Sequence, residues 1–236
     1  MNFDVRLPID RDGLKFAGVM AVIAIFLGNI STNMGWLGFI LTVACLLFFR
    51  DPERVHPTKK KDIVISPADG IILKITEGEP PAELELKGQW KKISIFMSLV
   101  NVHVNRAPVD GVVEKLFYVA GRFFNVTLDK ASEFNERLAT YMKTTDNTQV
   151  VFVQIAGLLA RRIRSDIKEG DSLEMGQRVG MIRFGSRVDV YMPSKVDILV
   201  EEGQITVAGE TILAKWQGTE KIASKSKDNK KHSEQS

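Results

Sequence analysis

The chain has 236 residues, 44% of them hydrophobic and 26% charged, a composition typical of globular rather than disordered proteins. The formal net charge is only +3, and no basic stripe interleaved with aromatic residues runs through the chain, so a nucleic-acid-binding function is not favoured. The single cysteine, Cys45, excludes an intramolecular disulfide and a cysteine-based metal site.

Two apolar helices are the first expected elements, in residues 16–49, which contain no charged residue. One helix of this length would measure about 50 Å, whereas the hydrocarbon core of a bilayer is about 30 Å thick. The polar sequence STNMG divides the stretch, which predicts a hairpin that enters a membrane and returns. Basic residues on both sides place its ends in the cytoplasm by the positive-inside rule. A buried helical hairpin in a soluble core stays open as the alternative, and a cleaved signal peptide is not expected.

Residues 1–62 are therefore expected to form a hairpin followed by a basic linker, RDPERVHPTKKK, which suits an anionic membrane surface. From residue 63 to residue 217, short β-rich runs alternate with glycine and proline. This pattern predicts a mostly β (α+β) domain with an antiparallel sandwich or barrel-like sheet. Helices are expected around Asp129–Tyr141 and Ala156–Arg162, and residues 218–236 are expected to be a disordered basic tail. The main expected strands are IVISPADGIILKI, KKISIFM, GVVEKLFYV, TQVVFVQIA, QRVGMIRFG and RVDVYMP.

The pair Gly185-Ser186 stands between two of these expected strands. Apolar residues alternate with polar ones after it, and this alternation places Ser186 on the apolar side of its strand. A Gly-Ser pair at such a junction is usually only a turn. It is also what an intramolecular N→O acyl shift requires, because glycine leaves its carbonyl open to approach and tolerates strained backbone angles. The serine hydroxyl then lies next to the peptide bond that it would attack.

Two further residues could take part in such chemistry. Asp69 lies in SPADG, which is also the composition of an ordinary β-turn. His103, in LVNVHVNRAP, is the one histidine of three that falls within the β-rich domain, and it is the candidate for general acid–base work. A lone histidine on a strand is more often a packed or surface residue. Metal binding is not expected there, since no second histidine or cysteine stands beside it.

Several segments together resemble the phosphatidylserine decarboxylase proenzyme family, in its short prokaryotic form. They are SPADG, NVHVNRAPVDG, DKASEFNER, QIAGLLARRI and GQRVGMIRFGSRVDVYMP, preceded by a hydrophobic hairpin that ends in FFRDPER. The resemblance covers about residues 14–216, and its most specific block is RFGSRVD. It implies a pyruvoyl-dependent enzyme that cleaves its own chain between Gly185 and Ser186. The products would be a β chain, 1–185, and an α chain, 186–236.

The same resemblance implies roles for individual residues. Ser186 would be the nucleophile and the precursor of a covalent pyruvoyl cofactor, His103 the base and Asp69 the carboxylate that orients it. Long-type members carry a second histidine where this chain has Arg106. One histidine would then serve both cleavage and decarboxylation, or Arg106 would take a share. Candidates for the substrate pocket are Arg106, Phe123, Phe124 and Phe184.

The implied reaction converts phosphatidylserine to phosphatidylethanolamine and carbon dioxide through a Schiff base with the pyruvoyl group. The implied partners are phosphatidylserine, the cell membrane on its cytoplasmic side, and the two chains of one proenzyme, as a heterodimer or a higher oligomer. The residues leave three alternatives open. These are a membrane-tethered serine hydrolase, although the chain has no GxSxG elbow, a non-catalytic β-barrel module, and a decarboxylase that acts on a serine ether lipid.

Overall fold

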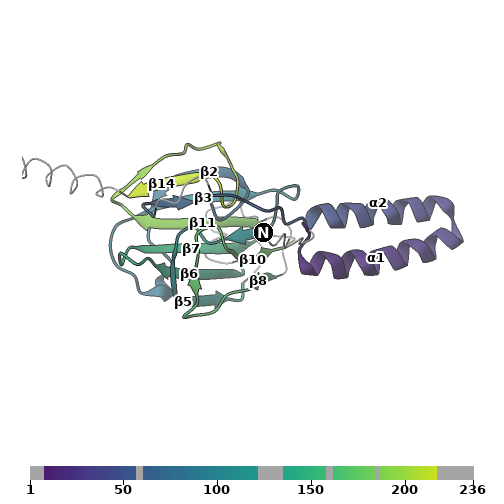
Figure 1. The fold of residues 1–236 in the computed structure, drawn as a ribbon, viewed down its shortest axis with the longest axis horizontal. Coiled ribbons are helices and arrows are strands. Elements are labelled where there is room, and N and C mark those ends of the chain that lie inside the picture. The colour runs from purple at the N-terminus through teal and green to yellow at the C-terminus, as the bar shows by residue number, and fades with distance from the viewer. Residues whose placement is uncertain (1–7, 57–60, 122–134, 158–161, 184–185, 217–236) are drawn as a thin grey trace, which may run out of the picture.

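The structure is a computed structural model that describes residues 8–56, 61–121, 135–157, 162–183 and 186–216 (Figure 1). Two helices, α1 (Arg11–Ile30) and α2 (Thr32–Phe48), form a hairpin that projects from one side of a β-rich body. Of these two, α1 is long and apolar enough to cross a membrane, while α2 is an apolar helix of 17 residues. At about 1.5 Å per residue, α1 is about 30 Å long.

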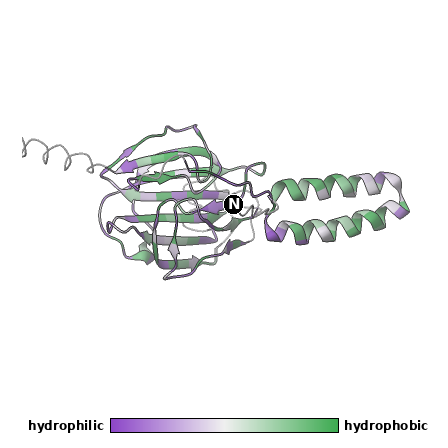
Figure 2. Cartoon of the chain, in the orientation of Figure 1, coloured by the Kyte–Doolittle hydropathy of each residue, from purple (hydrophilic) through white to green (hydrophobic). Residues whose placement is uncertain are grey.

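Small residues allow the two helices of the hairpin to approach closely. Gly35 lies against Gly28, and Gly38 lies against Ala24, and a Cβ at Gly35 or Gly38 would collide with the facing helix. Both helices of the hairpin are hydrophobic along most of their length in Figure 2, and many of their large apolar side chains are exposed. Within α2 no residue is buried, so the alternative of a helical hairpin inside a soluble core is wrong. The most polar parts of the hairpin are its turn and its base.

An ion cluster fixes the base of the hairpin to the body. The guanidinium of Arg164 contacts Asp10 at 2.6 Å, Asp12 at 2.8 Å and Asp166 at 2.8 Å. Asp10 also caps α1, since its carboxylate accepts the backbone N–H of Asp12. On the apolar side of the base, the rings of Phe16 and Phe49 stack with centroids 5.6 Å apart. The direction of the hairpin relative to the sheets is therefore defined by several side chains rather than by a loose linker.

The described residues of the body form three antiparallel sheets. Its largest sheet has eight strands in the order β13-β2-β3-β11-β7-β6-β5-β9 (Figure 1). In that order their bounds are Ile205–Thr206, Gly70–Glu77, Trp90–Met97, Ser186–Pro193, Gln149–Ala156, Arg137–Lys143, Gly111–Val119 and Ser172–Leu173. One three-stranded sheet contains β1 (Ile63–Ile65), β14 (Ile212–Trp216) and β12 (Val196–Ile198). The other contains β4 (Val104–Arg106), β10 (Arg178–Ile182) and β8 (Ile163–Ser165). The expected mostly β fold with a preceding apolar helix pair is confirmed.

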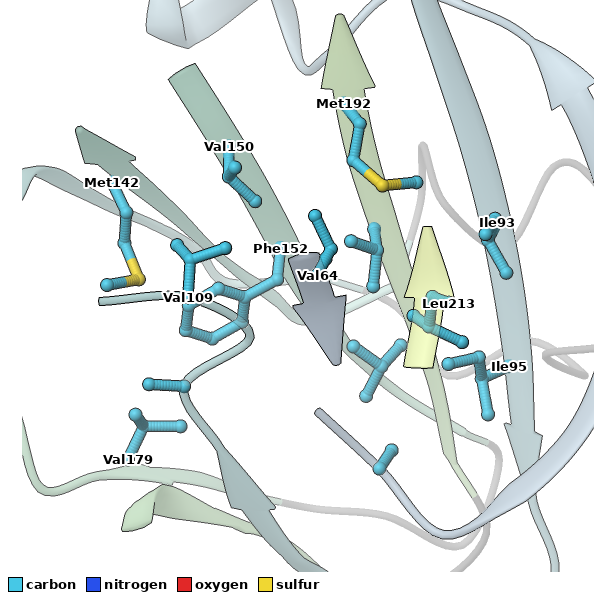
Figure 3. Packing of buried hydrophobic residues seen from close by; sticks show 14 of the residues in the cluster. Val64, Ile93, Ile95, Val109, Met142, Val150, Phe152, Val179, Met192 and Leu213 are labelled. Carbon is cyan, nitrogen blue, oxygen red and sulfur yellow. The ribbon is translucent and has the colours of Figure 1, made fainter. Parts of the chain in front are cut away.

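The main hydrophobic core brings together one face of the large sheet and residues of the smaller sheets (Figure 3). Phe152 of β7 is fully buried there, together with Val64 of β1 and Leu213 of β14. Full burial of such a side chain contributes about 1.5–3 kcal/mol to folding. This core holds the ends of β3, β7 and β11 in fixed positions, and the candidate site lies at those ends.

Strand β11 is buried on both faces because a hydrophobic cluster packs against each of them, one with Val188 and Val190 and the other with Tyr191. Its apolar face bears Val188 and Val190 in the main core, and Ser186 is fully buried, as the alternation predicts. The opposite face is also covered, and there Arg187 and Asp189 form an ion pair of 2.7 Å. Burying these two charges is tolerated because they are paired with each other.

One expected helix is wrong. The segment from Arg137 onward, which we expected to continue a helix from Asp129 to Tyr141, forms β6, and this strand pairs with both β5 and β7. Pairing on two sides overrides the local preference of the sequence, which contains several good helix formers. Residues 129–134 of that prediction lie outside the described residues. The expected short helix begins at Ala156, which in fact ends β7, and residues 158–161 of it also lie outside the described part.

Candidate active site

Ser186 is the first residue of β11. It lies at the end of the large sheet where the neighbouring strands β3 and β7 end. It lies opposite Met97, the last residue of β3, and opposite Ala156, the last residue of β7. The serine is fully buried, and its hydroxyl donates to the sulfur of Met97 at 3.3 Å. A thioether is a weak acceptor, so this contact holds the hydroxyl loosely. Gly185 and Phe184 lie outside the described residues.

Asp69 immediately precedes β2, at the same end of the sheet. One strand, β3, separates β2 from β11, so the backbones of the Asp69 and Ser186 segments are about 10 Å apart at normal strand spacing. The carboxylate is largely buried and has two partners. It accepts the backbone N–H of Ala208 at 2.7 Å and pairs with the guanidinium of Arg54 at 2.9 Å. In this structure Asp69 is thus bonded to the segment that follows the hairpin rather than to His103.

His103 immediately precedes β4 and is fully buried. Its Nδ1 lies 2.9 Å from the carbonyl oxygen of Asn101. A carbonyl can only accept a hydrogen bond, so Nδ1 carries the proton and Nε2 carries the lone pair. Nε2 is buried, and within the described part of the chain it has no hydrogen-bond partner. The ring packs on Phe48, the last residue of α2, with centroids 4.2 Å apart.

Burial lowers the pKa of His103 from 6.5 to about 4. The hydrogen bond to Asn101 opposes this shift, and the nearby cation of Arg50 adds to it. The imidazole is therefore neutral at pH 7, and an unbonded lone pair on Nε2 makes it able to accept a proton.

A short polar network links the segment of His103 to Ser186. The amide of Asn105, two residues after His103, lies 3.7 Å from the same Met97 sulfur that contacts the serine. Its oxygen accepts a hydrogen bond of 2.8 Å from Gln154 of β7. The amide of Asn105 also donates to the carbonyl of Pro67 in the SPADG segment. The network therefore holds β4 against the ends of β3 and β7, where Ser186 lies.

Comparison with known proteins decides the family. The family model described as phosphatidylserine decarboxylase matches residues 41–214. A phosphatidylserine decarboxylase proenzyme of Paramagnetospirillum magneticum is 50% identical over 214 residues, which are 90% of this chain and 89% of the relative. The proenzyme of Rickettsia akari is 49% identical over 221 residues, 93% of this chain and 95% of the relative. The chain belongs to the phosphatidylserine decarboxylase family. The resemblance inferred from the motifs is therefore confirmed.

Within this phosphatidylserine decarboxylase family member, Arg106 has structural contacts. Its guanidinium is buried and contacts the carbonyls of Gly176 and Pro52 at 3.0 and 2.9 Å, and the carboxylate of Asp51 at 3.3 Å. These bonds fasten the segment after the hairpin to the body. The structure thus gives Arg106 three partners within the protein, and its predicted place in a substrate pocket stays a prediction. The other predicted pocket residues, Phe123, Phe124 and Phe184, lie outside the described residues.

Four residues near the decarboxylase motifs were not singled out from the sequence. They are Arg54, Asn101, Asn105 and Phe48. Asn105 could have been found, because it follows His103 by two positions in the strand-like NVHVNRAP and residues two apart in a strand share a face. Phe48 and Arg54 stand in the FFRDPER segment, far from His103 and Asp69 in sequence. Their contacts depend on how the hairpin docks, which no local pattern reports.

Proposed function

We propose that this chain is a self-processing, pyruvoyl-dependent decarboxylase that converts phosphatidylserine to phosphatidylethanolamine and carbon dioxide. Its curated relatives are named phosphatidylserine decarboxylase proenzymes. The observation that carries the mechanism is the buried Ser186 at the start of β11, linked through Met97 and Asn105 to the segment of a neutral histidine with an open Nε2. A buried nitrogen without a hydrogen-bond partner costs free energy of folding, so its presence here favours a functional role for His103.

Self-cleavage begins with the hydroxyl of Ser186. His103 Nε2 accepts its proton, and Oγ attacks the carbonyl carbon of Gly185, so a C–O bond forms as the C–N bond breaks. The proton passes to the released nitrogen, which becomes the amino group of residue 186. Loss of the α-proton then breaks the Oγ–Cβ bond and frees the carboxylate of Gly185. The resulting dehydroalanine takes up water and loses ammonia, which leaves a pyruvoyl group at the start of the α chain.

The surroundings of residue 186 fit such a group. A pyruvoyl group lacks the amine and the hydroxyl of serine, and its neighbours on β3 and β7 are Met97 and Ala156, which demand no strong hydrogen bond. Once formed, the group supplies an electron-withdrawing carbonyl that stabilises the carbanion left by carbon dioxide. Nε2 of His103 is the atom from which the substrate carbon would receive its proton.

Asp69 stays our candidate for the carboxylate that stabilises the imidazolium. In the structure His103 is oriented by the carbonyl of Asn101, and Asp69 is bonded to Arg54. The proposed role therefore requires the bond to Arg54 to open during cleavage. Arg106 is not needed for this scheme, because its three contacts are structural, and His103 serves both steps.

The two products would stay in one fold. The α chain, 186–236, contributes β11, which pairs with β3 over eight residue pairs and with β7 over six. Both partners belong to the β chain, 1–185. Breaking one peptide bond at the start of β11 removes none of these ladder contacts. The proposed heterodimer is thus stabilised by the centre of the sheet.

The hairpin has the features of a membrane anchor. Many of its large apolar side chains are exposed, among them Ile25 at 70%, Phe26 at 67% and Trp36 at 63%. An exposed apolar surface of this extent is stable in water only when something covers it, and a bilayer does so over the length of α1. We therefore propose that the protein lies at the cell membrane. The basic residues on both sides of the hairpin favour the cytoplasmic side for the β-rich body, where a diacyl substrate would be within reach of Ser186.

Decarboxylation of carboxyl-labelled phosphatidylserine in vesicles tests this function. The wild type should release labelled carbon dioxide and form phosphatidylethanolamine, and Ser186→Ala should do neither. Ser94→Ala is the matched control, since Ser94 is a buried serine on the adjacent β3, and it should retain activity. Full activity of Ser186→Ala would overturn the proposal. Labelling of the wild type by a fluorophosphonate without decarboxylation would favour a serine hydrolase instead.

A further inference from the structure

A cleft of about 890 Å³ lies where the hairpin meets the body. Apolar side chains of the hairpin line one part of it, among them Leu41 and Phe48 of α2. Three arginines from separate segments line another part: Arg50 after α2, Arg162 before β8 and Arg183 after β10. The cleft thus combines an apolar wall with a cationic one.

The three guanidinium groups differ in their partners. Arg183 pairs with Asp12 at 2.7 Å and lies 5.4 Å from the ring centroid of Phe16. Arg50 donates to the carbonyls of Leu47 and Val100 but has no carboxylate partner among the described residues. The exposed side chain of Arg162 has neither a hydrogen bond nor an ion pair within the described part of the chain. Among the described residues, Arg162 is therefore the cation most available to an anion, while Arg50 is held by two carbonyls but its charge is not neutralised by a carboxylate.

We propose that this cleft binds the phosphodiester and the first acyl segments of an anionic glycerophospholipid, with Arg162 as the main contact of the phosphate. This inference rests on the proposed function and deepens it, because it assigns a subsite to each part of the substrate. A guanidinium matches a phosphate with two parallel hydrogen bonds, and a partly enclosed apolar setting strengthens them.

The position of the cleft suits this occupant. Phe48 lines the cleft and also packs on His103, so a head group that extends past the phosphate lies next to the imidazole. The volume falls within the range of ligand pockets, about 300–1,000 Å³. A complete diacyl lipid is larger, and the ends of its chains continue along the exposed apolar surface of α2. The lipid then reaches the site without leaving the bilayer.

The test measures binding by calorimetry to the detergent-solubilised protein with three probes. Dioctanoylphosphatidylglycerol has the phosphodiester and the chains but no amine, dioctanoylglycerol lacks the phosphate, and inorganic phosphate lacks the chains. The variants are Arg162→Ala and Arg162→Lys. Lys87→Ala is the control, because Lys87 is an exposed cation before β3, at the opposite end of that strand from Met97.

Arg162→Ala should weaken binding of dioctanoylphosphatidylglycerol about tenfold or more. The affinity of Arg162→Lys for this lipid should lie between those of Arg162→Ala and the wild type, and the affinity of Lys87→Ala should equal that of the wild type. Binding of dioctanoylglycerol should not respond to any of the three substitutions. In decarboxylation assays, Arg162→Ala should raise KM for phosphatidylserine by a similar factor and leave kcat nearly unchanged.

Equal binding of dioctanoylphosphatidylglycerol by the wild type and Arg162→Ala would overturn the assignment. Inorganic phosphate that binds as tightly as this lipid would overturn the acyl part of the site. The failure of the proposed function can be distinguished from the failure of the lipid site. If the wild type does not decarboxylate phosphatidylserine, yet binds dioctanoylphosphatidylglycerol through Arg162, the lipid site stands without the reaction. If the wild type decarboxylates phosphatidylserine and Arg162→Ala has the same KM, the proposed lipid site is wrong and the proposed function stands.

Discussion

Lowering the pH offers a direct perturbation of the proposed base. Self-cleavage requires the neutral form of His103, whose pKa is lowered to about 4 by burial. The rate of cleavage should therefore stay nearly constant from pH 8 to pH 5 and fall only as the pH approaches 4. An exposed histidine with its ordinary pKa would instead lose its base form below pH 6.5.

The difference is large at pH 5. A base with a pKa of about 4 is still about 90% neutral there, whereas one with a pKa of 6.5 is only about 3% neutral. The two cases thus differ about 30-fold in the amount of active base. The stability of the fold should change over the same pH range. The pKa of His103 is lower in the folded chain than in the unfolded one, so the unfolded chain takes up the proton first as the pH falls. Stability present above pH 6.5 is progressively lost towards pH 4, by about 3 kcal/mol in total.

The assay uses chain labelled in a short cell-free pulse in the presence of nanodiscs. Aliquots diluted into buffers from pH 4 to pH 8 are sampled over time, and the loss of the uncut band on a gel gives the rate. His103→Gln is the companion variant, and its rate at pH 7 should be lower by a factor of about 10²–10⁴. A wild-type rate that halves near pH 6.5 would show that His103 is not buried in neutral form, and the reasoning would fail.

Two further substitutions concern the packing around the site. Gly70→Ala should lower the free energy of unfolding by at least about 2 kcal/mol, because a Cβ there would collide with the carbonyl oxygen of Phe96. Gly18→Ala in α1, where a Cβ meets open space, should change it by no more than about 1 kcal/mol. Arg54→Ala should lower it by about 2–3 kcal/mol, since the largely buried carboxylate of Asp69 loses its cation and keeps one backbone N–H.

Urea unfolding in detergent measures all three. Equal stabilities of Gly70→Ala and Gly18→Ala would contradict the close approach of β2 to β3. Lys87→Ala is the control for Arg54→Ala, because it removes an exposed cation and so measures the effect of losing a positive charge without losing a buried ion pair. If Arg54→Ala costs no more than Lys87→Ala, the pair with Asp69 contributes nothing to the fold.

Much of the fold follows from local patterns in the sequence. The runs around β3, β5, β7 and β11 were expected nearly as they stand, because strands in a half-buried sheet alternate and end at glycine or proline. The hairpin followed from an uncharged stretch too long for one span. The strand β6 was not expected, since its preference for a helix is overridden by pairing on both sides, which is decided by the rest of the chain.

The candidate site was predictable in part. Ser186 and His103 were found through motifs, and the apolar side assigned to Ser186 is the one observed. The partners of Asp69 and His103 were not predictable, because Arg54 and Phe48 reach them only through the docking of the hairpin. Contacts between segments distant in sequence leave no periodic signal in either one.

The central claim is that the chain cuts itself between Gly185 and Ser186 and converts the serine. Intact-mass spectrometry of the purified wild type tests it most directly. We predict two chains, 1–185 and 186–236, and the smaller one should be lighter than the same chain with an N-terminal serine by the mass of one ammonia. Ser186→Ala should give one uncut chain. A wild type that decarboxylates phosphatidylserine as a single intact chain would contradict the account.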